Sequence, residues 1–298
     1  MKHILVVADP YNDEQVAFQK ALKLAKSTIA DINVISFCYD PLSDVQYDYP
    51  PSKTDTKAGV AADINLKQLV MREVQQQWND YIATQECTEQ VSHEVVWAKY
   101  IHLWLIEHCK THHYDLIVKT GRRSESFFYT PTDWQLFRES QVPIYCISKP
   151  DYQAKKVVLV ALDLKAKSKE KQLLNQRLLE SAFQLAVQTD AVLHCCYAIV
   201  IPTLVKDLDM IDVTAKVHKV ENEVRQQARS WFEVYDIDSK HLHIKEGKPW
   251  QVVNDCAAKL KAQCIVVGSM GRTGIVGKLI GNTAEKVINH ARSDLLVI

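Results

Sequence analysis

Residues 264–285 read CIVVGSMGRTGIVGKLIGNTAE and hold five of the eight glycines in the chain. The apolar run at 265–267 predicts a short buried strand, and the glycines after it predict a loop whose backbone can take positive φ and approach a ligand closely. Asn282 or Thr283 can cap the helix that follows, with Glu285 placed as in a capping box. Free N–H groups at a helix start, behind such a loop, are suited to bind phosphate.

Two common phosphate-binding motifs do not fit this loop. In a Walker A loop a Ser or Thr follows the Gly-Lys pair, whereas here Leu279 follows Lys278, and Arg272 stands where the first glycine is needed. The dinucleotide motif needs two glycines with one residue between them, and this stretch has no such pair. Turns alone would explain one or two glycines, so five in one stretch favour a phosphate site of another kind.

The composition is that of an ordinary globular protein. The 298 residues are 47% hydrophobic and 24% charged, with a formal net charge of zero. Zero net charge gives no electrostatic reason to expect a nucleic-acid partner or an anionic membrane. Because no apolar run approaches about 18 residues and no signal-peptide pattern is present, we expect a cytoplasmic protein. The eight cysteines are scattered without a C-x-x-C spacing and are interpreted as reduced core residues.

Alternating strands and helices occur twice along the chain, whose length itself favours two domains of about 150 residues. In the first half we predict strands at 3–8, 32–38, 92–97, 115–118 and 143–148, and helices at 14–27, 61–84 and 101–112. In the second half we predict strands at 156–162, 191–198, 241–244, 264–267 and 295–298, and helices at 170–189, 213–235 and 250–260. Asp9 and Asp163 each follow the first strand of a half. The sequence therefore predicts an α/β protein of two tandem open-sheet domains, 1–150 and 154–298, each a mostly parallel five-stranded sheet with helices on both faces.

The first half lacks the glycine-rich loop. Residues 119–123 (KTGRR) take the place of 268–272, and residues 130–132 (TPT) take the place of 281–283. Pro131 is compatible with a helix start but not with the same phosphate cradle. We expect the first half to be a structural partner, in which Asp9 caps the helix after it.

The spacing of Gly268, Gly271 and Gly281, with a small polar residue next, resembles the universal stress protein family, whose ATP-binding branch carries G-x2-G-x9-G-[S/T]. The tandem arrangement and the degenerate first loop resemble the E-type tandem members from bacteria. The resemblance implies an adenine-nucleotide-hydrolase-like fold, a cytoplasmic location and ATP at the carboxyl ends of the strands, where open α/β sheets bind ligands. Asn282 replaces the family's Ser or Thr and can still hydrogen-bond a phosphate.

The resemblance also implies which residues contact the nucleotide. Asp163 matches the acid that contacts adenine or ribose, and Cys195 matches the position whose backbone meets the adenine ring. The other matching residues line the approach to ribose and phosphate or form the phosphate cradle: Val267, Gly268, Gly271, Gly281, Asn282 and Thr283. We add Arg272, which is near enough in sequence to neutralise phosphate charge.

Two functions follow from these observations. The first is a stress-response sensor or regulator that binds ATP, with Mg²⁺ as a candidate companion, and hydrolyses it slowly at most, because no Walker B acid or general base is evident. The second is a carrier of another anionic or lipid-like molecule on the same fold, covered by the partly apolar loops at 39–56 and 199–212. In the family that the chain resembles, the last strands of two domains can pair at a dimer interface, so the resemblance implies that strands 143–148 and 295–298 pair as an intramolecular pseudo-dimer. Their apolar character agrees with burial, and a homodimer of whole chains is left open.

Two further groups of residues were weighed for function. Three pairs have spacings that two zinc ligands can use: His108 with His112, Cys109 with His113, and His241 with His243. No run of sequence offers four ligands, so we predict no metal site. The aromatic residues of the long helices, including Trp78 and Trp231, are interpreted as core and interdomain packing.

Overall fold

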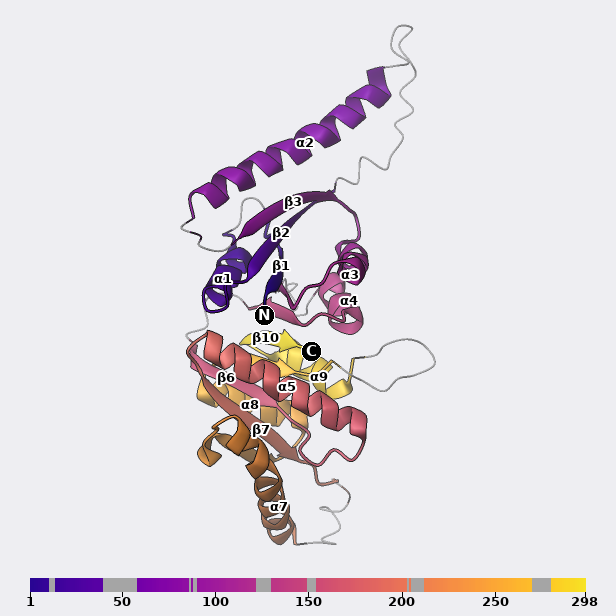
Figure 1. The fold of residues 1–298 in the computed structure, drawn as a ribbon. Coiled ribbons are helices and arrows are strands. Elements are labelled where there is room, and N and C mark those ends of the chain that lie inside the picture. Colours follow the sequence, from indigo (N-terminus) through magenta and orange to yellow (C-terminus); the bar gives the residue numbers. More distant parts are fainter. Residues whose placement is uncertain are drawn as a thin grey trace. The chain divides into compact units, whose positions relative to one another are not determined.

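The computed structural model describes residues 1–10, 14–39, 58–85, 87, 90–121, 130–148, 154–202, 204, 212–269 and 280–298. Its contacts divide the chain into two compact units, Met1–Thr120 and Gly121–Ile298, and each is described by itself (Figure 1). Most of the glycine-rich loop (270–279) and most of the two long loops predicted at 39–56 and 199–212 lie outside the described residues.

The first unit is built on a parallel sheet in the order β3-β2-β1-β4. Its strands are β1 (His3–Val7), β2 (Asp31–Cys38), β3 (Val91–Trp97) and β4 (Leu116–Thr120), and its helices are α1 (Val16–Ala25), α2 (Ala58–Ala83) and α3 (Ile101–Thr111). Ile4, Leu5 and Val6 are fully buried, as expected for a central parallel strand that is covered on both faces. The continuous apolar run of β1 therefore fits its place as an interior strand between β2 and β4.

The second unit is built on a sheet in the order β5-β10-β9-β6-β7-β8, parallel except for the pairing of β5 with β10. Its strands are β5 (Ile144–Ile147), β6 (Lys155–Ala161), β7 (Val192–Ile199), β8 (Leu242–Glu246), β9 (Ala262–Val267) and β10 (Asp294–Val297). Its helices are α4 (Pro131–Glu139), α5 (Lys169–Gln188), α7 (Val213–Val234), the 3₁₀ turn η2 (Ser239–His241), α8 (Pro249–Leu260) and α9 (Asn282–His290). These bounds confirm the predicted elements to within a few residues.

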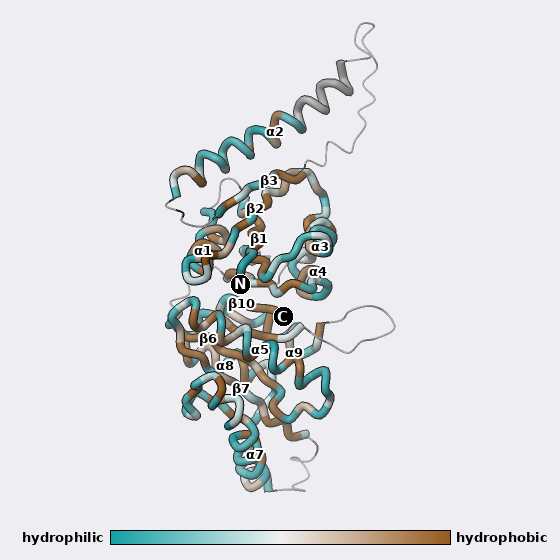
Figure 2. The backbone as a smooth tube through the Cα atoms, in the orientation of Figure 1, coloured by the Kyte–Doolittle hydropathy of each residue, from teal (hydrophilic) through white to brown (hydrophobic). Residues whose placement is uncertain are grey.

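Helix α7 shows how the second unit covers its sheet with amphipathic helices. Val220, Val224, Ala228 and Phe232 recur at a spacing of one helical turn and are buried, while the rest of α7 is mostly hydrophilic (Figure 2). Such a stripe is what a surface helix needs to pack on a sheet with one side and face water with the other. In the described residues, no helix has the length and apolar character that a membrane crossing requires.

The antiparallel pairing of β5 with β10 brings the predicted strands 143–148 and 295–298 together. Leu296 pairs with Tyr145, and the Tyr145 hydroxyl donates to Asp294 Oδ2 at 2.8 Å. Asp294 Oδ1 accepts from the Ser148 N–H at 2.9 Å. This pairing explains why α4 and β5 belong to the second compact unit although they precede the sequence repeat. The domain bounds 1–150 and 154–298 describe that repeat and stay a prediction.

All eight cysteines are free thiols, in keeping with the prediction that they are reduced. Five of them are buried in the second unit: Cys146, Cys195, Cys196, Cys256 and Cys264. The other three, Cys38, Cys87 and Cys109, are half-buried and are therefore not core residues in the strict sense.

Replacing Asp294 by Ala is expected to lower the free energy of unfolding by roughly 1–3 kcal/mol, because Tyr145 and Ser148 lose charge-assisted hydrogen bonds that are partly buried. Urea denaturation of the full chain measures the change. The control is Glu107→Ala, which removes a surface pair with Lys110 from a side chain that is 70% exposed. That control is expected to stay within about 0.5 kcal/mol of the unmodified chain. Equal losses in the two variants would contradict the role given to Asp294.

Candidate functional site

The carboxyl ends of β6 and β9 lie at the same edge of the second sheet, because these strands pair in parallel. Asp163 follows β6, and Gly268 directly follows β9. Ser269 donates its N–H to the Ile298 carbonyl at 2.7 Å, and its own carbonyl accepts from the Gly281 N–H at 3.3 Å. The start of α9 is thereby tied to the end of β9. The structure brings Asp163, Val267, Gly268 and the start of α9 to this edge.

An amide side chain fixes the backbone of Asp163. The Asp163 N–H donates to Asn175 Oδ1 at 3.0 Å, and Asn175 Nδ2 donates to the Asp163 carbonyl at 2.7 Å. Asn175 lies on α5 and is only 3% exposed, so both of its hydrogen bonds are made in a shielded place. The Asp163 side chain is 50% exposed and has the Lys171 ammonium 3.4 Å from its Oδ2. The clamp therefore holds the backbone while the carboxylate faces outward.

The equivalent aspartate of the first half is used differently. Gln15 clamps the Asp9 backbone in the same way, accepting from its N–H at 3.1 Å and donating to its carbonyl at 3.3 Å. The Asp9 carboxylate, however, accepts from the Ala17 N–H in the first turn of α1 at 3.0 Å. This confirms the prediction that Asp9 caps the following helix, and it leaves that oxygen engaged within the protein.

Helix α4, which belongs to the first half of the sequence, has the carboxylate of Asp133 at its N-terminal end. Thr130 is the N-cap, accepting from the Asp133 N–H at 3.3 Å and donating its hydroxyl to Asp133 Oδ2 at 3.0 Å. Pro131 occupies the first helical position, where a missing N–H does no harm. A buried carboxylate thus already occupies the positive end of this helix. Residues 130–133 thus form a side-chain cap at the start of α4, whereas α9 of the second half begins without one.

The start of α9 differs from the prediction. Its N-cap is Gly281, without a side-chain capping bond, and Asn282 and Thr283 are the first helical residues. The predicted capping box is wrong because the helix begins one residue too early for it, and the Glu285 N–H bonds the Gly281 carbonyl at 2.9 Å. The N–H groups of residues 282–284 have no acceptor among the described residues. They are the orphan donors that an anion can satisfy.

Gly268 has a packing role as well as its place at the edge. A Cβ at this position would lie 2.8 Å from Leu174 Cδ2 of α5, closer than carbon atoms approach. The glycine therefore lets the start of α5 pack closely against the end of β9. Gly271 and Arg272 lie outside the described residues, so their predicted roles stay predictions.

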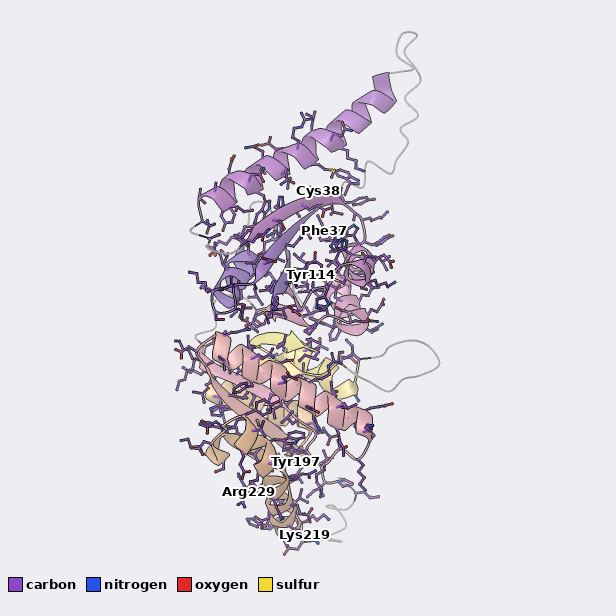
Figure 3. All side chains as sticks on the ribbon, viewed as in Figure 1. Phe37, Cys38, Tyr114, Tyr197, Lys219 and Arg229 are labelled. Atoms are coloured by element: carbon purple, nitrogen blue, oxygen red, sulfur yellow. The ribbon has the colours of Figure 1, made fainter. Side chains whose placement is uncertain are left out.

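Cys195 is not brought to the edge of the sheet. It is fully buried within β7, paired with Val160 on one side and Leu242 on the other. Ala161 pairs with Cys196, so counting onward along the register puts Ala198 level with Asp163. Tyr197 of β7 (labelled in Figure 3) is close enough to Asp163 to feel its charge: burial, and then the negative charge of Asp163, raise the pKa of the Tyr197 hydroxyl. Tyr197 was not among the predicted site residues.

A pocket of about 430 Å³ opens beside Asp163, between the first turns of α5 and the last turns of α7. That volume is in the range of small-molecule sites. Its lining comes from the loop after β6 and from the two helices: Asp163, Leu164, Ala166, Lys169, Gln172, Leu173, Asn175, Gln176, Gln227, Ser230 and Trp231. Trp231 was interpreted as packing, and instead it is a half-buried wall of this pocket. The sequence signal for this role was a tryptophan within the otherwise mostly polar outer face of α7.

The histidines of the second unit form a cluster at β7 and β8. His194 Nδ1 lies 2.7 Å from His243 Nε2, and the His241 ring packs on His194 with centroids 4.3 Å apart. Burial, and then the two neighbouring imidazoles, lower the pKa of His194 to about 4. On α3, His108 instead stacks on His112 and bonds the Tyr114 hydroxyl at 3.1 Å. Among the described residues, no three His, Cys, Asp or Glu side chains are grouped to hold a metal ion.

Comparison with known proteins identifies the family. A sequence model described as the universal stress protein family matches residues 1–148 and again residues 155–298. The chain belongs to the universal stress protein family. The two matches confirm a tandem member, as the sequence predicted. Over its whole length the chain is 29% identical to Universal stress protein E of Salmonella typhi and 27% identical to that of Escherichia coli K12, covering 94% and 93% of those proteins.

Solved structures agree with this assignment at the level of the fold. A protein of unknown function from Pseudomonas aeruginosa PAO1 aligns with a TM-score of 0.71 at 24% identity, covering 100% of this chain and 92% of that one. A universal stress protein from Archaeoglobus fulgidus aligns with a TM-score of 0.57 at 19% identity, covering 99% and 95%. The predicted fold of tandem α/β domains is confirmed.

The histidine cluster predicts a loss of stability in acid. Unfolded histidine takes up a proton near pH 6.5, whereas His194 in the folded chain does so at about pH 4. The unfolded state therefore binds more protons between these values, and the free energy of unfolding falls as the pH falls through that window. We expect the urea midpoint to fall between about pH 7 and about pH 5, and His194→Gln to make this fall shallower.

His93 of the first unit gives a matched comparison, because burial likewise lowers its pKa to about 4. His93→Gln is expected to make the fall of the urea midpoint with pH shallower as well, because it removes a buried histidine from the first unit. A pH profile identical in the original chain and in His194→Gln would show that this histidine does not titrate as described.

Proposed function

We propose that this protein binds an adenine nucleotide at the carboxyl edge of its second sheet and acts as a stress-response sensor or regulator through the bound state. The observation that carries the proposal is a difference between the halves. In the first half, the Asp9 and Asp133 carboxylates accept hydrogen bonds at the starts of α1 and α4. In the second half, Asp163 faces outward and α9 begins without a side-chain cap. Among the described residues, it is the second half that leaves both groups accessible to a ligand.

Each group suits a different part of a nucleotide. The N–H donors at the start of α9, with Gly281, Asn282 and Thr283, suit phosphate oxygens, because the positive end of a helix favours anions. The Asp163 carboxylate suits a ribose hydroxyl or a base amine, since it can only accept hydrogen bonds when ionised. Gly271 and Arg272 complete the proposed phosphate cradle from the sequence alone. Mg²⁺ would accompany ATP as a phosphate-bound ion and would need few protein ligands of its own.

Binding is proposed in preference to rapid turnover. Hydrolysis needs a positioned water and charge neutralisation around the transferring phosphoryl group. Among the described residues that line the pocket, Asp163 is the one carboxylate, and the nearby Lys171 ammonium holds it in an ion pair. Slow hydrolysis is therefore the most that we propose.

A charge at the first helical position tests the phosphate site. Asn282→Asp is expected to weaken ATP binding at least about tenfold by repulsion, while an acidic residue in the first turn stabilises α9 by about 0.3–1 kcal/mol. Asn282→Ser, which restores the residue type of the ATP-binding branch, is expected to keep or improve the affinity. Calorimetric titration with ATP and Mg²⁺, together with thermal melting, measures both effects. Unchanged affinity in Asn282→Asp would rule out phosphate at the start of α9.

The two equivalent aspartates provide a matched pair. Asp163→Ala is expected to weaken ATP binding with little loss of stability, because its side chain is half exposed and its ion pair is on the surface. Asp9→Ala is expected to leave ATP binding unchanged and to cost about 1 kcal/mol of stability, because α1 loses its cap. Titration and urea denaturation of both variants measure the contrast. Weaker ATP binding in Asp9→Ala alone would place the nucleotide in the first half.

A further inference from the structure

The pocket between α5 and α7 has an apolar floor and one flat aromatic wall. Leu164 and Ala166, from the loop after β6, are buried beneath it. Leu173 of α5 and Trp231 of α7 stand at its sides. Trp231 is half-buried where it lines the pocket. The planar apolar face of an indole that lines a pocket suits the stacking of another ring.

Amides dominate the polar part of the lining. Asn175 is committed to the Asp163 backbone, and Gln172 donates to the Ala166 carbonyl at 3.1 Å. Gln176 of α5 and Gln227 of α7 also line the pocket and make no hydrogen bond to another described residue. An amide both donates and accepts, and it therefore matches a ring edge that carries a donor next to an acceptor.

The charge in the pocket favours an uncharged ring. The lining holds one carboxylate, Asp163, and one ammonium, Lys169, so it has no net charge to select an anion or a cation. Gln176 and Gln227 would lose water without gaining hydrogen bonds if an acyl chain filled the space. The lining therefore fits an uncharged, planar nitrogen heterocycle better than a phosphate or a lipid chain.

We propose that this pocket binds the base of the nucleotide, stacked on Trp231 and hydrogen-bonded by Gln176 and Gln227. This proposal rests on the proposed function and adds to it the place of the base. The family resemblance implies instead a contact of the ring with the backbone of Cys195, which lies within β7. Asp163 lies both at the edge of the sheet and in the lining of the pocket, where it can take the ribose between base and phosphate.

The test uses the full chain and three ligands that separate base from phosphate: adenosine, ribose 5-phosphate and ATP. Trp231→Leu keeps an apolar side chain and removes the flat face. It is expected to weaken adenosine and ATP about tenfold and to leave ribose 5-phosphate unchanged, because stacking involves only the base. Trp250→Leu, on α8 against His290, is the matched control and is expected to leave all three affinities unchanged. Melting of each variant verifies that it folds.

The three ligands also separate failure of the pocket from failure of the phosphate site. If Trp231→Leu weakens adenosine binding and Asn282→Asp does not, the base pocket is supported, even if ATP binds no more tightly than adenosine. The opposite result is that Asn282→Asp weakens the binding of ATP and ribose 5-phosphate, while Trp231→Leu changes the affinity for neither adenosine nor ATP. That result would overturn the base pocket and leave the phosphate site supported. Gln176→Ala gives a second test, because it is exposed on α5 and its loss is expected to weaken adenosine without altering the fold.

Discussion

Parallel pairing of strands that are buried on both faces is the constraint on which the second unit depends. Val158, Leu159 and Val160 of β6 and Ile265 and Val266 of β9 are all fully buried. Because the two strands run in parallel, the chain leaves β6 and β9 at one edge, where Asp163, Gly268 and the start of α9 follow.

The two halves share this framework and diverge in a few hydrogen bonds. Both hold the backbone of an aspartate with an amide side chain, Gln15 in the first half and Asn175 in the second. Gln15 lies just before α1 and brings the first turn of that helix onto the Asp9 carboxylate, whereas Asn175 lies well inside α5. The Asp163 backbone is therefore clamped, while its carboxylate, among the described residues, caps no helix and pairs only at the surface with Lys171. The place of one amide side chain relative to its helix thus decides whether the neighbouring carboxylate caps that helix or faces outward.

Helix α5 links the edge of the sheet to the pocket. Gly268 lets Leu174 approach the end of β9, Asn175 holds Asp163, and Gln176 faces the pocket toward α7. Three consecutive residues of one helix thus contact three parts of the site.

The sequence by itself determined the fold class, the tandem arrangement and the family, because hydrophobic periodicity and glycine spacing are local properties of the chain. It also determined that Asp9 caps a helix, since that contact is between near neighbours in sequence. Only the tertiary structure decided that Asp163 is released, that Cys195 is enclosed within the sheet, and that Trp231 faces a pocket. Those outcomes depend on register and on the approach of helices far apart in sequence, which no local pattern specifies.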